Sequence, residues 1–180
     1  FVELATELGL QPMRTGKDLA YQRHPLSFLV EAADDICYTI IDFEDGINLG
    51  LIEEEFALEY LIKLVKDSID IKKYHSLQYK KDRVSYLRAL AIGTLIQEAA
   101  AVFLENEQAI MDGTYGISLL EKCKYEAQIN DILQLSISKI YNSTEVVEKE
   151  VAGYKILADL LQVFVKAVNT TFEGTASNYD

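Results

Sequence analysis

The sequence predicts an all-α fold, a multi-helix bundle in one region that covers residues 1–180. Apolar residues recur every three or four positions along almost the whole chain, which is the period of a helix buried on one side. Two prolines and nine glycines are too few for a fold of many short strands. No internal repeat, low-complexity tract or linker marks the start of a second domain.

The apolar pattern predicts six helices, beginning with a short one over residues 2–9. Residues 11–24 are expected to be irregular. A long helix is expected over residues 25–45, because Pro25 suits a first turn and Gly46 suits a helix end. Four more are expected over residues 53–67, 82–111, 118–141 and 142–168, with Asn142 and Glu145 as a capping box and a frayed tail over 170–180.

Charge and cysteine content limit the class of protein. The net charge of -12 repels nucleic acid in general, although a local basic patch can still bind it. No apolar run reaches the roughly 18 residues of a membrane span, and no signal-peptide pattern is present. Cys37 and Cys123 lie in apolar helical patterns, so we expect buried, reduced thiols in a cytoplasmic protein. Because Phe1 is not Met, we expect a piece of a longer protein.

The helix expected over residues 25–45 carries six acidic residues and no Lys or Arg. On a wheel of about 100° per residue, five of the acids and one tyrosine share an arc of about 100°. Glu44 lies outside this arc, and apolar residues fill nearly all the rest of the circumference, which is typical of a buried helix. The residues of the arc, in order around the wheel, are Asp34, Asp45, Tyr38, Glu31, Asp42 and Asp35.

Two interpretations of this acidic arc remain open, because crowded carboxylates repel one another and partial burial adds to the cost. In the first, water solvates a thin acidic stripe on an ordinary amphipathic helix. In the second, a cation compensates the carboxylates. A divalent metal ion is the simplest such cation, and carboxylate oxygens suit hard ions such as Mg²⁺ and Mn²⁺.

The same helix carries the letters EAADDICY at residues 31–38 and DFED at residues 42–45. This segment closely resembles the EAADDI-x-Y-x-x-x-D-x-E-D stretch of bacterial dGTP triphosphohydrolases, members of the HD phosphohydrolase superfamily. Two weaker matches follow in the family's order. GTYGISLL at residues 113–120 is similar to G-T-[FY]-x-x-x-L-L, and residues 147–157 are similar to the family's E-x-x-G-Y-x-x-[IL] stretch. Together the matches indicate the C-terminal part of such an enzyme.

The resemblance implies an HD-type bundle, a divalent metal ion, and hydrolysis of dGTP to deoxyguanosine and inorganic triphosphate. Asp34 matches the family's distant metal-binding Asp, and we expect its side chain to face inward beside Tyr38 and Asp42. Tyr38 and Asp42 match positions near the sugar and the phosphates, which makes them the candidate catalytic and substrate-binding residues. Asp35 matches a family position without a firm role. The resemblance also implies a homo-oligomer with regulatory nucleotide or single-stranded DNA sites.

The family's metal-binding His-Asp dipeptide is absent, because Pro25 follows His24 and Ser76 follows His75. The missing ligands are therefore expected upstream of Phe1, and this chain alone is expected to be inactive. The chain then fits a second class of function, a non-catalytic helical interaction or regulatory module. A third possibility is an HD phosphohydrolase that acts on other dNTPs or another phosphate ester, because the fold and the metal do not fix the substrate.

Phosphates also require positive charge. Arg88 is the candidate phosphate-binding residue, because it lies in an apolar helix and a guanidinium grips phosphate bidentately. Arg23 and Lys17 are weaker candidates. The basic segment as a whole is more typical of a solvated charge run before a helix, since basic runs usually lie on the surface. That segment contains Lys72, Lys73, Lys80, Lys81, Arg83 and Arg88.

Overall fold

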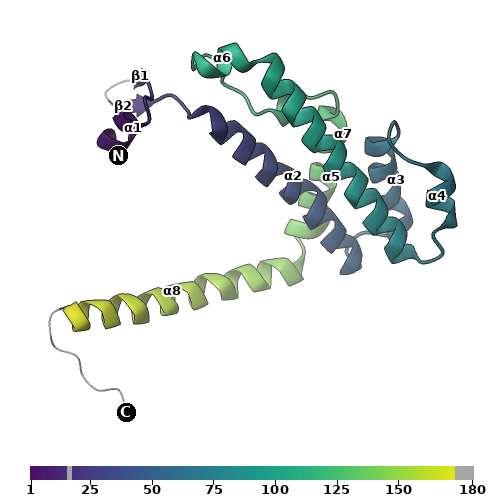
Figure 1. The fold of residues 1–180 in the computed structure, drawn as a ribbon. Coiled ribbons are helices and arrows are strands. Elements are labelled where there is room, and N and C mark those ends of the chain that lie inside the picture. Colours follow the sequence, from purple (N-terminus) through teal and green to yellow (C-terminus); the bar gives the residue numbers. More distant parts are fainter. Residues whose placement is uncertain (16–17, 173–180) are drawn as a thin grey trace.

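The computed structural model describes residues 1–15 and 18–172, and its helices confirm the all-α class. Figure 1 shows α2 and α5 side by side, with α3 and α7 packed against this pair and α8 extending away from the bundle. The elements in chain order are α1 (Val2–Glu7), β1 (Pro12–Thr15), β2 (Asp18–Tyr21), α2 (Pro25–Asn48), α3 (Glu54–Val65), α4 (Ile71–Ser76), α5 (Lys80–Glu105), α6 (Glu107–Met111), the 3₁₀ turn η1 (Leu120–Lys122), α7 (Glu126–Ser136), the π-helical turn η2 (Ile137–Tyr141) and α8 (Thr144–Phe172).

Helix α2 begins at Pro25, as predicted. His24 caps it, since its Nδ1 atom accepts a hydrogen bond from the backbone N–H of Leu26 at 3.2 Å. One face of α2 is buried against α5 and α7 at helical spacing. The largest buried side chains on that face are Phe28, Ile36, Ile40 and Phe43.

Helix α5 lies at the centre of the bundle and contacts α2 and α3. Its buried residues follow steps of three and four, which places them on one side of the helix. By length and composition, α5 is the one helix in residues 1–15 and 18–172 that is apolar enough to cross a bilayer. Charged residues interrupt its sequence, so it contains no continuous apolar run of that length. The buried residues are Val84, Leu87, Ala91, Leu95, Ala99 and Val102.

The predicted end of α2 at Gly46 is wrong, because the helix continues to Asn48 and turns at Gly50, whose φ is +71°. Gly46 is buried and has another purpose. A Cβ atom built on it would lie 2.7 Å from Cγ1 of Ile140, and closer still to Cδ1. Gly46 therefore allows α2 to approach η2 closely, and Ile140 is itself buried.

Several other boundaries differ from the prediction. Strands β1 and β2 pair in antiparallel fashion, with Thr15 opposite Asp18, although residues 11–24 were expected to be irregular. Helix α4 was not predicted; Asp70 caps it by accepting hydrogen bonds from Lys72 N and Lys73 N. The helix expected over 82–111 breaks at Asn106, and the one expected over 118–141 is divided into η1, α7 and η2.

The last helix starts at Thr144, and its cap lies one residue later than predicted. The hydroxyl of Ser143, and not Asn142, accepts a hydrogen bond from Val146 N at 3.4 Å. The helix continues to Phe172, so residues 170–172 are helical, and the remainder of the tail expected to fray lies outside the described residues.

We predict that Gly46→Ala lowers the free energy of unfolding by about 1–3 kcal/mol, because the added methyl group overlaps a buried side chain. Gly93→Ala is the matched control. Gly93 is also helical, a Cβ there meets nothing within 4 Å, and the substitution should stabilise by up to about 1 kcal/mol. Urea denaturation of the two variants measures both effects. Equal shifts in the two variants would show that α2 does not approach η2 so closely.

Candidate functional site

The acidic arc of α2 faces away from the helix's buried face. Asp34 and Asp45 are exposed, whereas Glu31, Asp35 and Asp42 are half-buried. The expectation that α2 is buried nearly all round is wrong for this chain. Next to the acidic arc, a second face of the helix is apolar and is also exposed; Val30 on this face is 69% exposed. The other exposed residues of this face are Leu26, Leu29, Ala33, Cys37 and Ile41. Cys37 is therefore a free, exposed thiol and not the buried one expected, whereas Cys123 is free and buried as expected.

Asp34, the candidate metal ligand, opens to solvent in this chain. It makes no hydrogen bond or ion pair with any other described residue. We expected this side chain to face inward, and its exposure differs from that expectation. It stands one helical turn before Tyr38, on the same side of α2. Its carboxylate is thus free to reach a ligand that approaches the exposed face.

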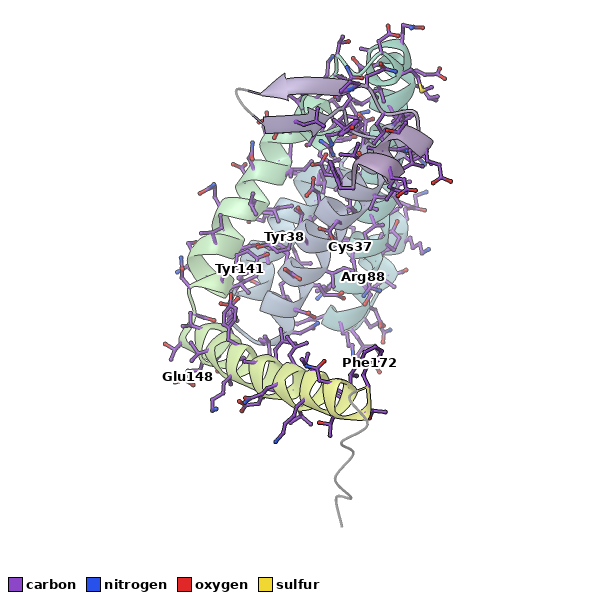
Figure 2. All side chains as sticks on the ribbon, turned by 90° about the vertical axis from the view of Figure 1, so that its left-hand side faces the viewer. Cys37, Tyr38, Arg88, Tyr141, Glu148 and Phe172 are labelled. Atoms are coloured by element: carbon purple, nitrogen blue, oxygen red, sulfur yellow. The ribbon has the colours of Figure 1, made fainter. Side chains whose placement is uncertain are left out.

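Tyr38 and Asp42 are brought together by a residue that the sequence reasoning missed, Tyr141. The rings of Tyr38 and Tyr141 are stacked, with centroids 5.2 Å apart and an interplanar angle of 23°. The hydroxyl of Tyr141 donates a hydrogen bond to Oδ2 of Asp42 at 2.9 Å. Figure 2 shows the two tyrosines near each other where α2 meets the end of η2.

Burial, together with hydrogen bonding to Tyr38 and Asp42, raises the pKa of Tyr141 far above its ordinary value. The hydroxyl therefore remains a donor and holds the Asp42 carboxylate in place. Tyr141 ends the π-helical turn η2, in which Asn142 N bonds to Ile137 O. A π turn adds one residue to the helical turn and re-aims the side chains that follow, and such turns are frequent at functional sites.

Arg88, the candidate phosphate-binding residue, is engaged by the chain itself. Its Nη1 atom lies 2.6 Å from Oε2 of Glu44. Glu44 is the acid outside the arc, and it is only 8% exposed. Arg88 therefore neutralises a buried carboxylate, which explains why an acid is tolerated on an otherwise apolar part of α2. Glu44 follows Asp34 by ten residues, about 15 Å along the helix axis, so the structure does not place Arg88 beside Asp34.

The other basic candidates are paired or exposed, except Lys17 and Arg83; Arg83 is half-buried, and its Nε atom has no hydrogen-bond partner among the described residues. Arg23 forms an ion pair with Glu31 at 2.8 Å, and its guanidinium lies 4.1 Å from the ring centroid of Phe28. Lys72, Lys73, Lys80 and Lys81 are all exposed, as a solvated charge run would be. Lys17 lies outside the described residues.

A pocket of about 260 Å³ adjoins the arc between α2, η1 and α7. Asp35 and Tyr38 line it from α2, opposite Glu121 and Glu126. Burial, and then the negative charges of Glu31, Asp34 and Glu121, raise the pKa of Asp35 above its ordinary value. The pocket thus contains a carboxyl group that ionises less readily than an ordinary aspartate.

The described residues supply one candidate metal ligand and no complete metal site. Within residues 1–15 and 18–172, no group of three or more His, Cys, Asp or Glu side chains is placed to hold an ion. Glu31, Asp42 and Glu44 each have a partner in the chain, so each acid is compensated separately. Asp34 fits one ligand position only, and further ligands would have to come from outside the described residues.

Curated relatives match this chain over about nine tenths of its length. A deoxyguanosinetriphosphate triphosphohydrolase-like protein of Synechocystis is 35% identical over 168 residues, which are 93% of this chain and 37% of the relative. The chain is therefore similar to part of a longer protein of this name. A similarly named protein of Listeria monocytogenes is 31% identical, covering 91% of this chain and 38% of the relative. The deoxyguanosinetriphosphate triphosphohydrolase of Yersinia pestis is 27% identical, covering 90% and 34%.

The chain therefore spans less than two fifths of the length of these three relatives. The resemblance found in its motifs is confirmed, and the proportion covered is consistent with the C-terminal part of such a protein. No family model matches the chain.

We predict that Arg88→Met lowers the free energy of unfolding by about 2 kcal/mol, because Glu44 would be left as a buried carboxylate without its partner. The double variant Arg88→Met, Glu44→Gln should lose clearly less than Arg88→Met alone. Arg23→Met is the control and should cost less than about 1 kcal/mol, since both members of that ion pair are partly exposed. Equal losses for the single and double Arg88 variants in urea denaturation would contradict the role of this pair.

We predict that Asp35→Asn stabilises the chain at pH 7 by up to about 0.5 kcal/mol, a small value because water screens this partly exposed group. Because the pKa of Asp35 is higher in the folded chain than in the unfolded chain, its carboxyl group lowers the free energy of unfolding least at pH values below the unfolded-state pKa. The free energy of unfolding of the wild type then falls as the pH rises through the folded-state pKa. The gain should therefore be present at pH 7 and vanish near pH 3. Chemical denaturation at both pH values measures it, and a gain that is larger at pH 3 would contradict the assignment.

Proposed function

We propose that the protein containing this chain hydrolyses dGTP, and other dNTPs to an extent still to be measured, to a deoxynucleoside and inorganic triphosphate. The Tyr38–Tyr141–Asp42 arrangement on the exposed face of α2 carries the proposal, because it holds two family-matched residues in a fixed geometry beside a free carboxylate. The names of the relatives support the same chemistry.

In this proposal Asp34 supplies one ligand to a divalent ion, Mg²⁺ or Mn²⁺, and the remaining ligands come from outside this chain. When bound, such an ion polarises a phosphoryl oxygen or lowers the pKa of the attacking water. The lack of any hydrogen bond or ion pair between Asp34 and another described residue supports this role, since a carboxylate already paired within the chain would be a poor additional ligand.

The other two residues orient the substrate. Asp42 accepts a hydrogen bond from the sugar 3′-hydroxyl, and Tyr141 holds that carboxylate in position. Tyr38, 50% exposed and stacked on Tyr141, presents its hydroxyl to a phosphate or sugar oxygen. Water attacks the α-phosphorus, the bond to the sugar oxygen breaks, and triphosphate leaves intact. Arg88 contributes to phosphate binding only through the N–H groups that Glu44 leaves free.

Product analysis of the complete protein with each dNTP, in Mg²⁺ or Mn²⁺, tests the reaction. Triphosphate together with free nucleoside is the expected result, whereas diphosphate or pyrophosphate would contradict it. Asp34→Asn should lower the rate by more than about 1,000-fold, because several kcal/mol of charge stabilisation would be lost. A variant that retains activity would remove Asp34 from the site.

We predict that Tyr141→Phe lowers kcat/KM by about 3- to 10-fold, the value of one hydrogen bond of about 1 kcal/mol. Tyr79→Phe is the control, since Tyr79 is exposed and lies far along the chain from this site. Steady-state kinetics of the two variants would contradict the positioning role of Tyr141 if both behave like the wild type.

The alternative is a non-catalytic helical interaction or regulatory module, favoured by the absence of a complete metal site from the described residues. Metal titration of the complete protein separates the two functions. An enzyme that binds a divalent ion gains thermal stability by mass action, whereas a scaffold gains none. A homo-oligomer, a regulatory nucleotide or single-stranded DNA as partners, a cytoplasmic location and the lack of a membrane partner belong to the same proposal.

A further inference from the structure

The cavity beside Tyr38 has no part in the reaction as described so far. It measures about 260 Å³ and lies between α2, η1 and α7. Pockets that enclose a whole drug-sized ligand measure roughly 300–1,000 Å³, so this one suits a single ring system and not an entire nucleotide. Part of its wall is apolar, from Leu120, Ile129 and Leu133. The cavity therefore fits a flat ligand of one or two fused rings.

The polar side chains of the cavity are mainly hydrogen-bond acceptors. Asp35 and Glu121 line it from α2 and η1, and neither side chain forms a hydrogen bond or ion pair with another described residue. Glu126 adds a third carboxylate, whose Oε1 atom accepts a hydrogen bond from Nδ2 of Asn130 at 2.6 Å. Among the described residues, no Lys or Arg lines the cavity. It therefore favours a ligand that donates hydrogen bonds and carries no negative charge.

Of the three parts of a deoxynucleoside triphosphate, only the base meets these requirements. The carboxylates repel a triphosphate. The sugar is already assigned to Asp42, which does not line the cavity. Tyr38 belongs both to the cavity and to the stacked pair with Tyr141, so the base and the sugar would occupy adjoining positions.

The order of the residues along α2 fits the stereochemistry of a nucleotide. The base and the 5′-phosphate project from one face of the sugar ring, and the 3′-hydroxyl projects from the other. Asp34, assigned to the metal and phosphates, is next to Asp35 in the sequence. Asp42, assigned to the 3′-hydroxyl, follows Asp35 by seven residues, about 10 Å along the helix axis. A single nucleotide can therefore reach all three positions at once.

We infer that this cavity holds the guanine base of the substrate and that Asp35 and Glu121 determine the preference for guanine. Guanine presents its N1–H and N2–H₂ donors side by side, which suits carboxylate acceptors. Its O6 atom can accept from the hydroxyl of Thr39 or the second N–H of Asn130, which both line the cavity. Adenine, cytosine and thymine each turn at least one acceptor toward a carboxylate, which costs binding free energy. The inference rests on the proposed function, which places the sugar at Asp42.

Comparison of dGTP with dITP tests this assignment in the complete protein, because dITP lacks only the 2-amino group. We expect the wild type to prefer dGTP in kcat/KM by about 10- to 100-fold, the value of a hydrogen bond to a charged acceptor. Glu121→Gln and Asp35→Asn should each lower this ratio at least about 5-fold, since an amide accepts more weakly than a carboxylate. Glu59→Gln is the control, because Glu59 is exposed on α3 and does not line the cavity.

The ratio of the two substrates separates recognition from folding. A variant that folds poorly loses kcat/KM for dGTP and dITP alike, and its ratio stays that of the wild type. A wild-type ratio near one would overturn the inference and leave the proposed hydrolysis intact. An unchanged ratio in both cavity variants, or an equal change in Glu59→Gln, would also overturn it.

Nucleoside binding tests the cavity without the reaction. Isothermal titration calorimetry of the complete protein with deoxyguanosine and deoxyinosine requires neither metal nor phosphate. We expect tighter binding of deoxyguanosine by the wild type, with the difference lost in Glu121→Gln, even if the protein releases no triphosphate from any dNTP. Equal affinities for the two nucleosides, or no binding of either up to millimolar concentration, would overturn the inference.

Discussion

Apolar side chains at helical spacing along one face of α2 pack against α5, and this contact determines the direction in which every other face of the helix points. Since Phe28, Ile36, Ile40 and Phe43 must face the core, the acidic arc is turned toward solvent. Gly46 lets η2 approach the C-terminal turns of the helix, and this approach places Tyr141 against Tyr38 and Asp42. Core packing therefore fixes the geometry of the candidate site.

Local patterns predicted the helical class, the start of α2 at Pro25 and the shared face of Asp34, Tyr38 and Asp42, because these depend on periodicity within one helix. They did not predict Tyr141 or the Glu44–Arg88 pair, whose partners stand 99 and 44 residues apart. The hairpin had one signal, Gly16 as the first of two residues between short strands, but four residues per strand gave little alternation. Gly46 was interpreted as a helix end because sequence alone cannot show a close approach.

Three acidic residues of α2 have a partner elsewhere in the chain, and the others have none among the described residues. Arg23, Tyr141 and Arg88 compensate Glu31, Asp42 and Glu44 one by one, and each partner comes from a different segment. Asp34, Asp35 and Asp45 form no side-chain hydrogen bond or ion pair with another described residue, and Asp34 is the one that the family resemblance assigns to a metal. Beside it, apolar residues of α2 remain exposed, as does the whole of α8. Both surfaces suit packing against further protein, which agrees with a chain that spans under two fifths of its relatives.

The orientation of α2 is tested most directly by its cysteine. Cys37 lies on the exposed side of the helix, and Cys123 is buried, where burial raises the pKa of its thiol. A thiol-specific reagent should modify Cys37 rapidly in the native chain and Cys123 only after denaturation. The rapid reaction should be absent from the Cys37→Ser variant. Protection of Cys37, or rapid modification of Cys123, in the folded chain would contradict the packing of α2 on which the site depends.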